Sequence, residues 1–309
     1  MVKRKKAHQL FHEYFEEWVE LYKVGAVRKV TLDKYYLTHQ RIQELAPELR
    51  LSDLSRINYQ KLLNSYALTH EKQTTMDFHH QVKGAIMDAL EEGLIEKNPT
   101  RKVIIKGKFP KEKRPKFLNQ FELQCLLKQL NLTNELNWDW FILLTAKTGL
   151  RFSEVLGLTP KDFDFFNQSL NVTKTWDYKS SIGEFQPTKN ESSKRKISID
   201  WQTTMQFSQL LKDMDEEKPI FVRERVFNST INNRLKVLCE RAEIPVITVH
   251  SLRHTHASLL LFAGVSIASV AKRLGHSSMT TTQETYLHII QELENQDNDK
   301  IIRHLAMLV

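Results

Sequence analysis

Cysteine is nearly absent from this chain of 309 residues, which contains only Cys125 and Cys239. Both lie in apolar helical contexts, LQCLLKQL and LKVLCERA, so we expect buried thiols rather than a disulfide framework or a thiolate zinc site. No run approaches the roughly 18 uninterrupted apolar residues that a membrane span needs. The N-terminal sequence MVKRKKAHQL also lacks the apolar core of a secretion signal. These absences predict a cytoplasmic protein with no membrane partner.

Acidic residues are in deficit, with 37 Asp and Glu against 45 Lys and Arg, a net charge of +8. Cationic side chains gain affinity for polyanions by releasing condensed counterions, so this balance points toward nucleic acid. The segment RKVIIKGKFPKEKRPK concentrates the charge in eight basic residues, namely Arg101, Lys102, Lys106, Lys108, Lys111, Lys113, Arg114 and Lys116. We interpret them as candidate DNA contacts, and the alternative is a solvated linker.

Glycine and proline are also scarce, and their positions in this basic segment mark a domain boundary. Before it, apolar and aromatic residues recur at helical spacing in residues 11–22, 62–66 and 82–90. We therefore predict a helical domain over residues 1–106, in which the aromatic stripe forms the core. A basic linker over residues 107–116 and a second domain over residues 117–309 follow.

The second domain combines helical and strand patterns. Asn119 and Glu122 form a capping-box pattern, and an aromatic-rich helix follows that ends near Gly149. The short alternating stretches LNVTKTW, GEFQPT and RKISID predict one small antiparallel sheet. Helical patterns resume at Trp201 and continue to the C-terminus. The expected fold class is mainly α, with a small antiparallel sheet in the second domain.

The stretch VHSLRHTHA contains an arginine among three histidines. His250, Arg253 and His254 share one helical face, whereas His256 points elsewhere and is interpreted as incidental. An HxxxH pattern without a catalytic glutamate or a third ligand is a poor metal site, so no metal is expected. Arginine with histidine suits a phosphate, because the guanidinium binds two oxygens and the imidazole donates a hydrogen bond or transfers a proton.

Two further stretches complete a pattern. TGLRFSEVLGL places Arg151 between a glycine and a short helix, with Glu154 available to orient it. Its alternative interpretation is a surface arginine beside a helical glutamate. LGHSSMTTTQETYLH places His276 directly after Gly275 and Tyr286 ten residues later. Such a tyrosine is ordinarily an amphipathic core residue with its hydroxyl at the surface.

The boxes T-G-L-R-x-S-E, H-x-x-R, L-G-H and the distal tyrosine, in that order, resemble the tyrosine recombinases of the phage integrase family. The resemblance covers the chain from about Asn119 to its C-terminus. The helical domain and its basic linker resemble the core-site DNA-binding domain of the family, which has a SAM-like fold. The family also uses a lysine on a β-hairpin, and PTKNESSKRKISI offers Lys189, Lys194 and Lys196. We favour Lys189, which precedes the loop.

The resemblance implies a catalytic set of Arg151, Lys189, His250, Arg253, His276 and Tyr286. In that scheme the arginines clamp the scissile phosphate, the tyrosine attacks it, and the lysine protonates the departing 5′ oxygen. The histidines bind the phosphate and assist proton movement, and Glu154 and His254 have supporting roles. The resulting 3′-phosphotyrosine keeps the phosphodiester energy, so neither a cofactor nor ATP is required.

The resemblance also implies partners. These are double-stranded DNA with specific recombination sites, a homotetramer on that DNA, and a DNA-bending factor or an excisionase, within a bacterial host cell. Many relatives carry a further N-terminal domain for arm-type sites. The helical pattern here begins near Phe11 and leaves no room for it, so we expect either a simpler recombinase or a chain that lacks that module. The segment from His288 docks either on a neighbouring subunit or on its own domain.

Two rival functions remain. A type IB topoisomerase shares the catalytic set but relaxes DNA without a specific site. A non-catalytic regulator would use SIASVAKRLGHSSMTTTQETY as a helix-turn-helix, with Arg273 or residues 280–282 facing a groove. That second interpretation leaves Arg151, His250 and Arg253 without a joint purpose.

Overall fold

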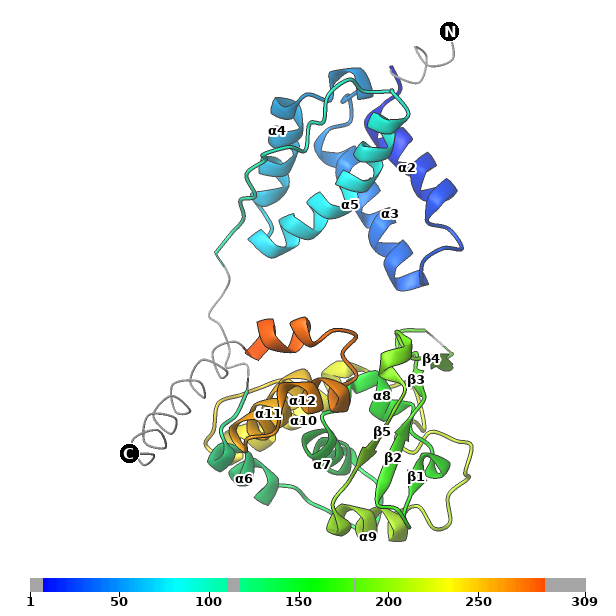
Figure 1. The fold of residues 1–309 in the computed structure, drawn as a ribbon, viewed down its shortest axis with the longest axis vertical. Coiled ribbons are helices and arrows are strands. Elements are labelled where there is room, and N and C mark those ends of the chain that lie inside the picture. The colour runs from blue at the N-terminus through cyan, green and yellow to red at the C-terminus, as the bar shows by residue number, and fades with distance from the viewer. Residues whose placement is uncertain (1–7, 110–116, 181, 287–309) are drawn as a thin grey trace, which may run out of the picture. The chain divides into compact units, whose positions relative to one another are not determined.

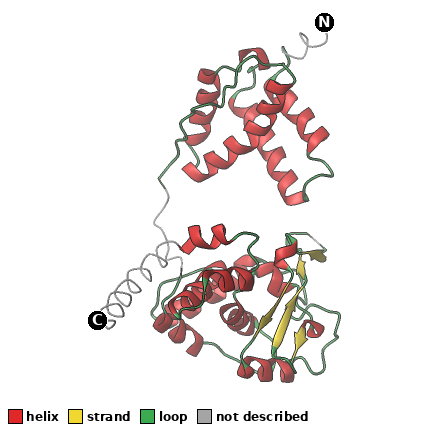
Figure 2. Ribbon diagram, viewed as in Figure 1, coloured by secondary structure: helices red, strands yellow, loops and turns green. Residues whose placement is uncertain are grey.

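The computed structural model describes residues 8–109, 117–180 and 182–286. The chain divides into two compact units, residues 1–112 and 113–309. The described part of the first unit is helical, whereas the second combines helices with short strands (Figures 1 and 2). Of the predicted basic segment, Lys111, Lys113, Arg114 and Lys116 lie outside the described residues, as does the C-terminal segment from residue 287.

The described part of the first unit contains the helices α2 (Phe11–Tyr22), α3 (Lys29–Leu45), α4 (Arg56–Ala67) and α5 (Lys72–Glu91), with a 3-10 turn at Leu51–Asp53. The predicted aromatic stripe of α2 is core at Phe11, Phe15 and Trp18, but its end, Leu21 and Tyr22, is exposed. The indole Nε1 of Trp18 donates to Asp88 of α5 at 2.5 Å. The sequence pattern missed α3, because only two of its 17 residues are buried and its apolar periodicity is weak.

Residues 101–109 lie along the first unit. The side chain of Gln60 on α4 bonds both the carbonyl and the amide of Ile104, each at 2.8 Å. The amide of Lys108 donates to the carbonyl of His70 at 2.8 Å, and Val103 and Ile105 pack against the core. The start of the predicted linker is therefore hydrogen-bonded to the helical unit.

The helices of the second unit in the described residues are α6 (Gln120–Lys128), α7 (Trp138–Thr148), α8 (Phe152–Leu156), α9 (Trp201–Leu210), α10 (Asn228–Arg241), α11 (Val249–Phe262) and α12 (Ile267–Leu274). Residues 279–286 are also helical. The capping box of Asn119 and Glu122 is confirmed at the start of α6. Of the two cysteines, Cys239 is buried, but Cys125 is only partly buried, so the prediction of two buried thiols holds for one.

The predicted single sheet is wrong, because the described strands form two antiparallel sheets. One contains β1 (Phe163–Asp164), β2 (Ser169–Val172) and β5 (Arg195–Ser198), and the other contains β3 (Lys174–Trp176) and β4 (Phe185–Pro187). Val172 pairs with Arg195, but Lys174, two residues later, pairs with Pro187. The run LNVTKTW therefore changes partner at Thr173, which alternation alone does not reveal.

The core of the second unit is built around α7. Phe141, Ile142 and Leu144 of this helix are fully buried, and α8, α10 and α11 pack against it (Figure 1). The helix ends at Gly149, whose backbone is left-handed with φ of 67°. This glycine stop places Leu150 and Arg151 at the start of α8. Among the described residues, no helix has both the length and the apolar character that crossing a membrane requires.

Gly149 gives a test of this packing. A methyl group added there would lie 2.7 Å from Cδ2 of His256 and 3.0 Å from Cδ2 of Leu274. We expect Gly149→Ala to lose about 1 kcal/mol of unfolding free energy to the left-handed backbone and about 1–3 kcal/mol more to overpacking. Gly264, with φ of 82° and open space around it, is the matched control. Equal losses for Gly149→Ala and Gly264→Ala in urea unfolding would contradict the packing argument.

Candidate active site

The arginine of VHSLRHTHA is buried in the second unit. α11 begins after Thr248, whose side chain accepts a hydrogen bond from the amide of Ser251 at 3.2 Å. Arg253 is 4% exposed and donates from Nη1 to the carbonyl of Gly149 at 2.8 Å. Its Nη2 donates to the carbonyl of Leu274 at 2.7 Å. One guanidinium therefore joins the C-terminal ends of α7 and α12.

The end of α12 collects three arginines from distant parts of the chain. Arg195 of β5 donates from Nε to the carbonyl of Arg273 at 2.6 Å. Arg253 binds the next carbonyl, that of Leu274, and Arg151 donates from Nη2 to the carbonyl of Gly275 at 3.2 Å. The last carbonyls of a helix lack partners within the helix and carry partial negative charge, so they attract cations.

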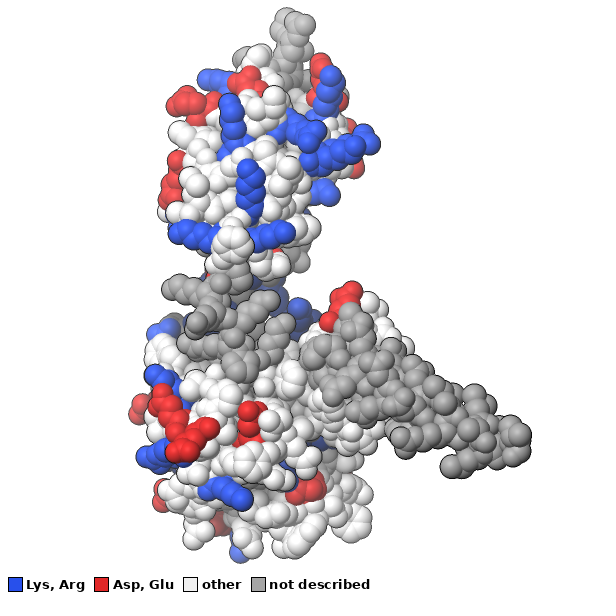
Figure 3. Space-filling view, turned by 90° about the vertical axis from the view of Figure 1, so that its left-hand side faces the viewer, with Lys and Arg blue, Asp and Glu red and all other residues white. Residues whose placement is uncertain are grey.

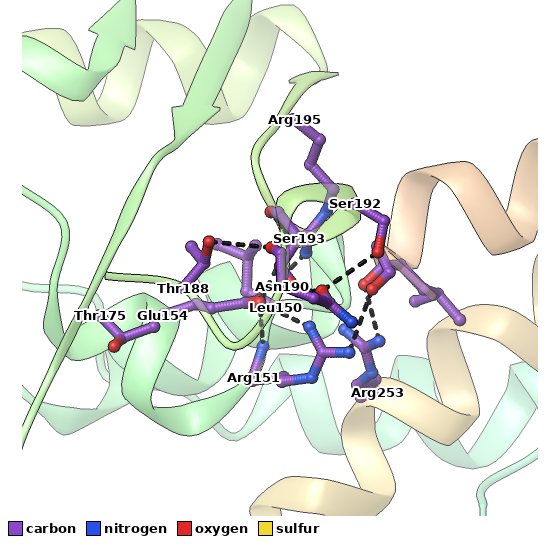
Figure 4. Close-up of polar contacts among 12 residues, drawn as sticks. Leu150, Arg151, Glu154, Thr175, Thr188, Asn190, Ser192, Ser193, Arg195 and Arg253 are labelled. Carbon is purple, nitrogen blue, oxygen red and sulfur yellow. Dashed lines mark hydrogen bonds and ion pairs between the residues drawn. The ribbon is translucent and has the colours of Figure 1, made fainter. Parts of the chain in front are cut away.

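A single buried carboxylate balances part of this charge. Glu154 is 1% exposed and accepts from Nη1 of Arg151 at 2.7 Å and from the backbone amide of Arg151 at 2.9 Å. It also accepts from Nη1 and Nη2 of Arg195 at 3.2 and 3.0 Å (Figure 4). Burial by itself raises the pKa of Glu154, but hydrogen bonds and charges from Arg195 and Arg151 outweigh it and leave this pKa below its ordinary value. Glu154 therefore stays ionised.

The site keeps an excess of positive charge. Among the ion pairs of the described residues, Glu154 is the only carboxylate that pairs with Arg151 or Arg195, and Arg253 pairs with none. Burial, followed by the charge of Arg151, lowers the pKa of Arg253 to about 9. Burial and the charges of Arg253 and Arg151 lower the pKa of His276 to about 4. Burial disfavours any charged group here, and the arginine charges make further positive charge more unfavourable still. A bound anion would relieve this repulsion between the arginines.

Tyr286 faces this group of charges. It is 2% exposed, and its hydroxyl lies 3.0 Å from Nδ1 of His254. Burial raises the pKa of Tyr286 to about 12, while the charge of Arg253 opposes that increase. Nδ1 of His276 lies 2.7 Å from Oγ1 of Thr282, which ties the loop after α12 to the helix that carries Tyr286.

His250 occupies the exposed side of the site. Its ring meets that of His254 edge to face, with 4.9 Å between the centroids. His250 is exposed overall, but neighbouring groups partly bury its ring. This burial lowers the pKa of His250, and the charges of Arg253 and Arg151 lower it further. The neutral ring is therefore favoured, and it can donate one hydrogen bond and accept another.

The three candidate lysines differ in their partners. Nζ of Lys194 lies 2.9 Å from Oε1 of Glu191, and Nζ of Lys196 lies 2.8 Å from Oδ2 of Asp164. Lys189 is exposed and has no ion-pair partner among the described residues. Its ammonium group is thus available to a ligand, whereas the other two are engaged with carboxylates.

The turn that carries Lys189 packs against the site. The side chain of Asn190 accepts hydrogen bonds from Ser192, at 3.0 Å, and from Ser193 (Figure 4). A methyl group added at Gly275 would lie 3.1 Å from both the carbonyl oxygen of Ser192 and Cα of Ser193. The turn is therefore in contact with the loop that bears His276.

Two residues of this network escaped the sequence analysis. Arg195 sits in RKISI, where a basic residue on an alternating strand looks solvated, but its side chain is buried against Glu154. His256, interpreted as incidental, is also buried. Its Nδ1 donates to the carbonyl of Ala146 at 3.0 Å, and its Nε2 accepts from Nε of Arg273 at 2.9 Å.

Arg273 therefore points inward. Its guanidinium also donates to the carbonyls of Ser198 and Lys147, at 3.0 and 3.3 Å. The helix-turn-helix interpretation, in which Arg273 faces a DNA groove, is wrong on this point. Within the described residues, no group of three or more His, Cys, Asp or Glu side chains is arranged to hold a metal ion.

Glu154 makes the stability of the second unit depend on pH. Its folded-state pKa is below the unfolded value of roughly 4.3, so its contribution is present above that pH and is lost as the pH falls through the folded pKa. We expect Glu154→Gln to lower the free energy of unfolding at pH 7 by about 3 kcal/mol, and the deficit to shrink below about pH 4. Glu191→Gln, at an exposed ion pair, is the control and should change little. A deficit that stays constant in denaturant titrations from pH 7 to pH 3 would contradict the assignment.

The profile described as "Phage integrase family" matches residues 116–292. The integrase of Staphylococcus phage L54a is 24% identical, over 94% of this chain and 92% of that protein. A tyrosine recombinase of Thermosipho africanus is 31% identical, over 75% of this chain and 78% of its own length.

Solved structures share the fold. The Tn1549 transposon integrase in complex with transposon right end DNA superposes with a TM-score of 0.76 at 18% identity, over 90% of this chain and 95% of that one. A lambda integrase tetramer bound to a Holliday junction gives a TM-score of 0.64 at 18% identity, over 89% and 79%. These likenesses confirm the predicted mainly helical fold class, although the described strands form two small antiparallel sheets instead of the one predicted. From the profile and the relatives, the chain belongs to the phage integrase family and is a tyrosine recombinase, an enzyme that breaks and rejoins DNA.

Proposed function

We propose that this recombinase cleaves its DNA site with Arg151, Lys189, His250, Arg253, His276 and Tyr286, to integrate or excise a phage or another mobile element. The observation that carries this assignment is the convergence at the end of α12. Arg151, Arg195 and Arg253 meet the carbonyls of residues 273–275 there, and Glu154 pairs with the first two of them only. The next residue on α11, His254, contacts the hydroxyl of Tyr286. An anionic phosphodiester supplies the missing negative charge.

The phosphate would be bound by Arg151 and Arg253. A guanidinium has five N–H donors, and the hydrogen bonds described above occupy two on each residue. The remaining donors can reach non-bridging oxygens, where negative charge grows in the transition state. His250 and His276, both favoured in their neutral forms, would donate further hydrogen bonds to the same oxygens.

Cleavage then follows an in-line path. The Tyr286 oxygen bonds to phosphorus, the bond from phosphorus to the 5′ oxygen breaks, and Lys189 protonates that oxygen. Two observations support Lys189 for this role. Its turn packs against Gly275 beside the site, and the other two candidates, Lys194 and Lys196, are paired with carboxylates. The 3′-phosphotyrosine is rejoined when a 5′ hydroxyl attacks phosphorus and displaces the tyrosine.

The first unit would bind the duplex on either side of the cut. Lys and Arg predominate on its face that contains α4 (Figure 3). Arg56, Lys97, Arg101 and Lys102 line one groove of this face, and Arg56, Lys61 and Lys106 line the next. We call these six basic residues the α4 basic surface. Their exposed charges suit a sequence-independent grip on phosphates.

Two solved relatives bear on how the protein assembles on DNA. The solved lambda integrase is a tetramer on a Holliday junction, and the Tn1549 integrase is bound to transposon DNA. We propose a homotetramer on paired sites for this chain as well, with a bending factor or an excisionase as further partners. Recombination between two site-bearing plasmids tests this. Relaxation of supercoiled DNA without any need for a site would favour the type IB topoisomerase alternative.

The nucleophile has a direct test. Tyr286→Phe should bind site DNA as the wild type does but form no covalent adduct, because the attacking oxygen is gone. A nicked duplex that traps the 3′-phosphotyrosine, run on a denaturing gel, measures the adduct. Tyr36→Phe, which removes an exposed hydroxyl bonded to Glu20, should still form it. An adduct that persists in Tyr286→Phe would assign the chemistry to another residue.

The α4 basic surface also has a test. Each phosphate contact adds about 0.9 to the slope of log K against log salt concentration. The double variant Lys102→Ala and Lys106→Ala should therefore flatten that slope by about 1.8 if both residues contact phosphates. Lys218→Ala, an exposed lysine paired with Asp215 in the second unit, should leave it unchanged. Equal slopes for the double variant and the wild type would remove these residues from the interface. The same assay applies to Lys111, Lys113 and Arg114, which lie outside the described residues.

A further inference from the structure

The hydroxyl of Tyr286 has a specific polar partner. Nδ1 of His254 lies 3.0 Å from it, and the two rings are 5.8 Å apart between centroids. His250 and His276, the two histidines of the recombinase boxes, make no hydrogen bond to this hydroxyl among the described residues. Nδ1 of His276 is instead engaged with Thr282. His254 is thus the histidine that touches the reacting oxygen.

We propose that His254 is a further catalytic residue of the cleavage reaction, whose Nδ1 orients the hydroxyl of Tyr286 and takes its proton during attack. This inference rests on the function proposed above. Its geometric support is that His254 directly follows Arg253 on α11. The group that would bind the phosphate and the group that holds the nucleophile therefore share one rigid helix, whose residues 252–258 are largely buried. Such a shared scaffold fixes the attacking oxygen relative to phosphorus.

The role requires a neutral imidazole at His254. A proton acceptor at Nδ1 must carry its own proton on Nε2. The titratable and charged groups that face His254 include His250 and Arg253 on α11, Tyr286 on the last described helix, and His276 after α12. Because the phenol is buried and its pKa is raised to about 12, it needs such an acceptor.

The step balances without any co-reactant. In cleavage the bond between the Tyr286 oxygen and phosphorus forms, and the bond from phosphorus to the 5′ oxygen breaks. The phenol proton moves to Nδ1 of His254, and Lys189 protonates the 5′ oxygen. In rejoining, the 5′ oxygen bonds to phosphorus, the tyrosine leaves, and His254 returns the proton to it. His254 should therefore affect both directions.

The test is His254→Asn. The asparagine side-chain oxygen can accept a hydrogen bond near the position of Nδ1 but does not take up a proton at neutral pH. We expect single-turnover cleavage to slow by about 10²-fold or more, with unchanged site binding and unfolding midpoint. The fall in wild-type rate at acid pH, where a protonated Nδ1 no longer accepts, should disappear. His80→Asn, an exposed histidine of the first unit, is the matched control.

A modified substrate separates the two proton transfers. Sulfur in place of the 5′ bridging oxygen leaves as a thiolate and needs no proton. It should restore cleavage by Lys189→Ala but not by His254→Asn. Wild-type rates for His254→Asn at every pH, or rescue of it by the sulfur substrate, would overturn the proposal. If wild type and His80→Asn also form no adduct, it is the proposed function that fails.

A spectroscopic measurement covers the case in which His254→Asn does not fold. In protein with ¹⁵N-labelled histidine, Tyr286→Phe removes the hydroxyl and should shift the Nδ1 resonance of His254. The resonance of His256, which is bonded to Ala146 and Arg273, should stay in place. An unchanged His254 resonance would overturn the proposal without any change at position 254.

Discussion

The hydrogen bonds between three arginines and the last carbonyls of α12 hold the site together. Arg195, Arg253 and Arg151 bind the carbonyls of residues 273, 274 and 275 in turn, so mutually repelling cations are fixed within one helical turn. A cation at a helix C-terminus gains about 0.3–2 kcal/mol, whereas removing an ion from water costs several kcal/mol. The helix end alone cannot offset three such costs. Glu154 and the carbonyls of Gly149 and Ser193 offset part of the rest, and the phosphate of the proposed substrate would add to it.

The same balance explains the state of the neighbouring groups. The pKa of His276 is lowered to about 4 and that of His256 to about 3, in each case by burial first and arginine charges second, so both are neutral at pH 7. The arginines therefore carry the charge of the site, while the histidines contribute hydrogen bonds. Burial keeps the phenol of Tyr286 protonated as well. If Tyr286 attacks as proposed, this protonated phenol needs a proton acceptor and a bound phosphate together.

Local signals in the sequence predicted much of this arrangement. The capping box at Asn119 and the stops at Gly149 and Gly275 depend on neighbouring residues only, and all three are present. Arg195 and His256 were missed because their partners lie far away in sequence. Glu154 precedes Arg195 by 41 residues, and the carbonyl that His256 binds is 110 residues upstream. The choice of Lys189 among the three lysines stays a prediction, because it depends on a phosphate that the protein binds.

The two kinds of anion contact proposed for this protein differ in physical origin. The cations of the α4 basic surface are exposed, so they gain affinity from counterion release and tolerate shifts along the DNA backbone. Arg253 is buried and already held by two carbonyls, so its guanidinium has a fixed direction. A phosphate shifted along the DNA backbone would still bind the exposed cations with little loss of affinity. It would, however, leave the buried Arg253 without a counterion. Under the proposed function, the buried cluster would therefore select the phosphate to be cut, and the α4 basic surface would retain the duplex.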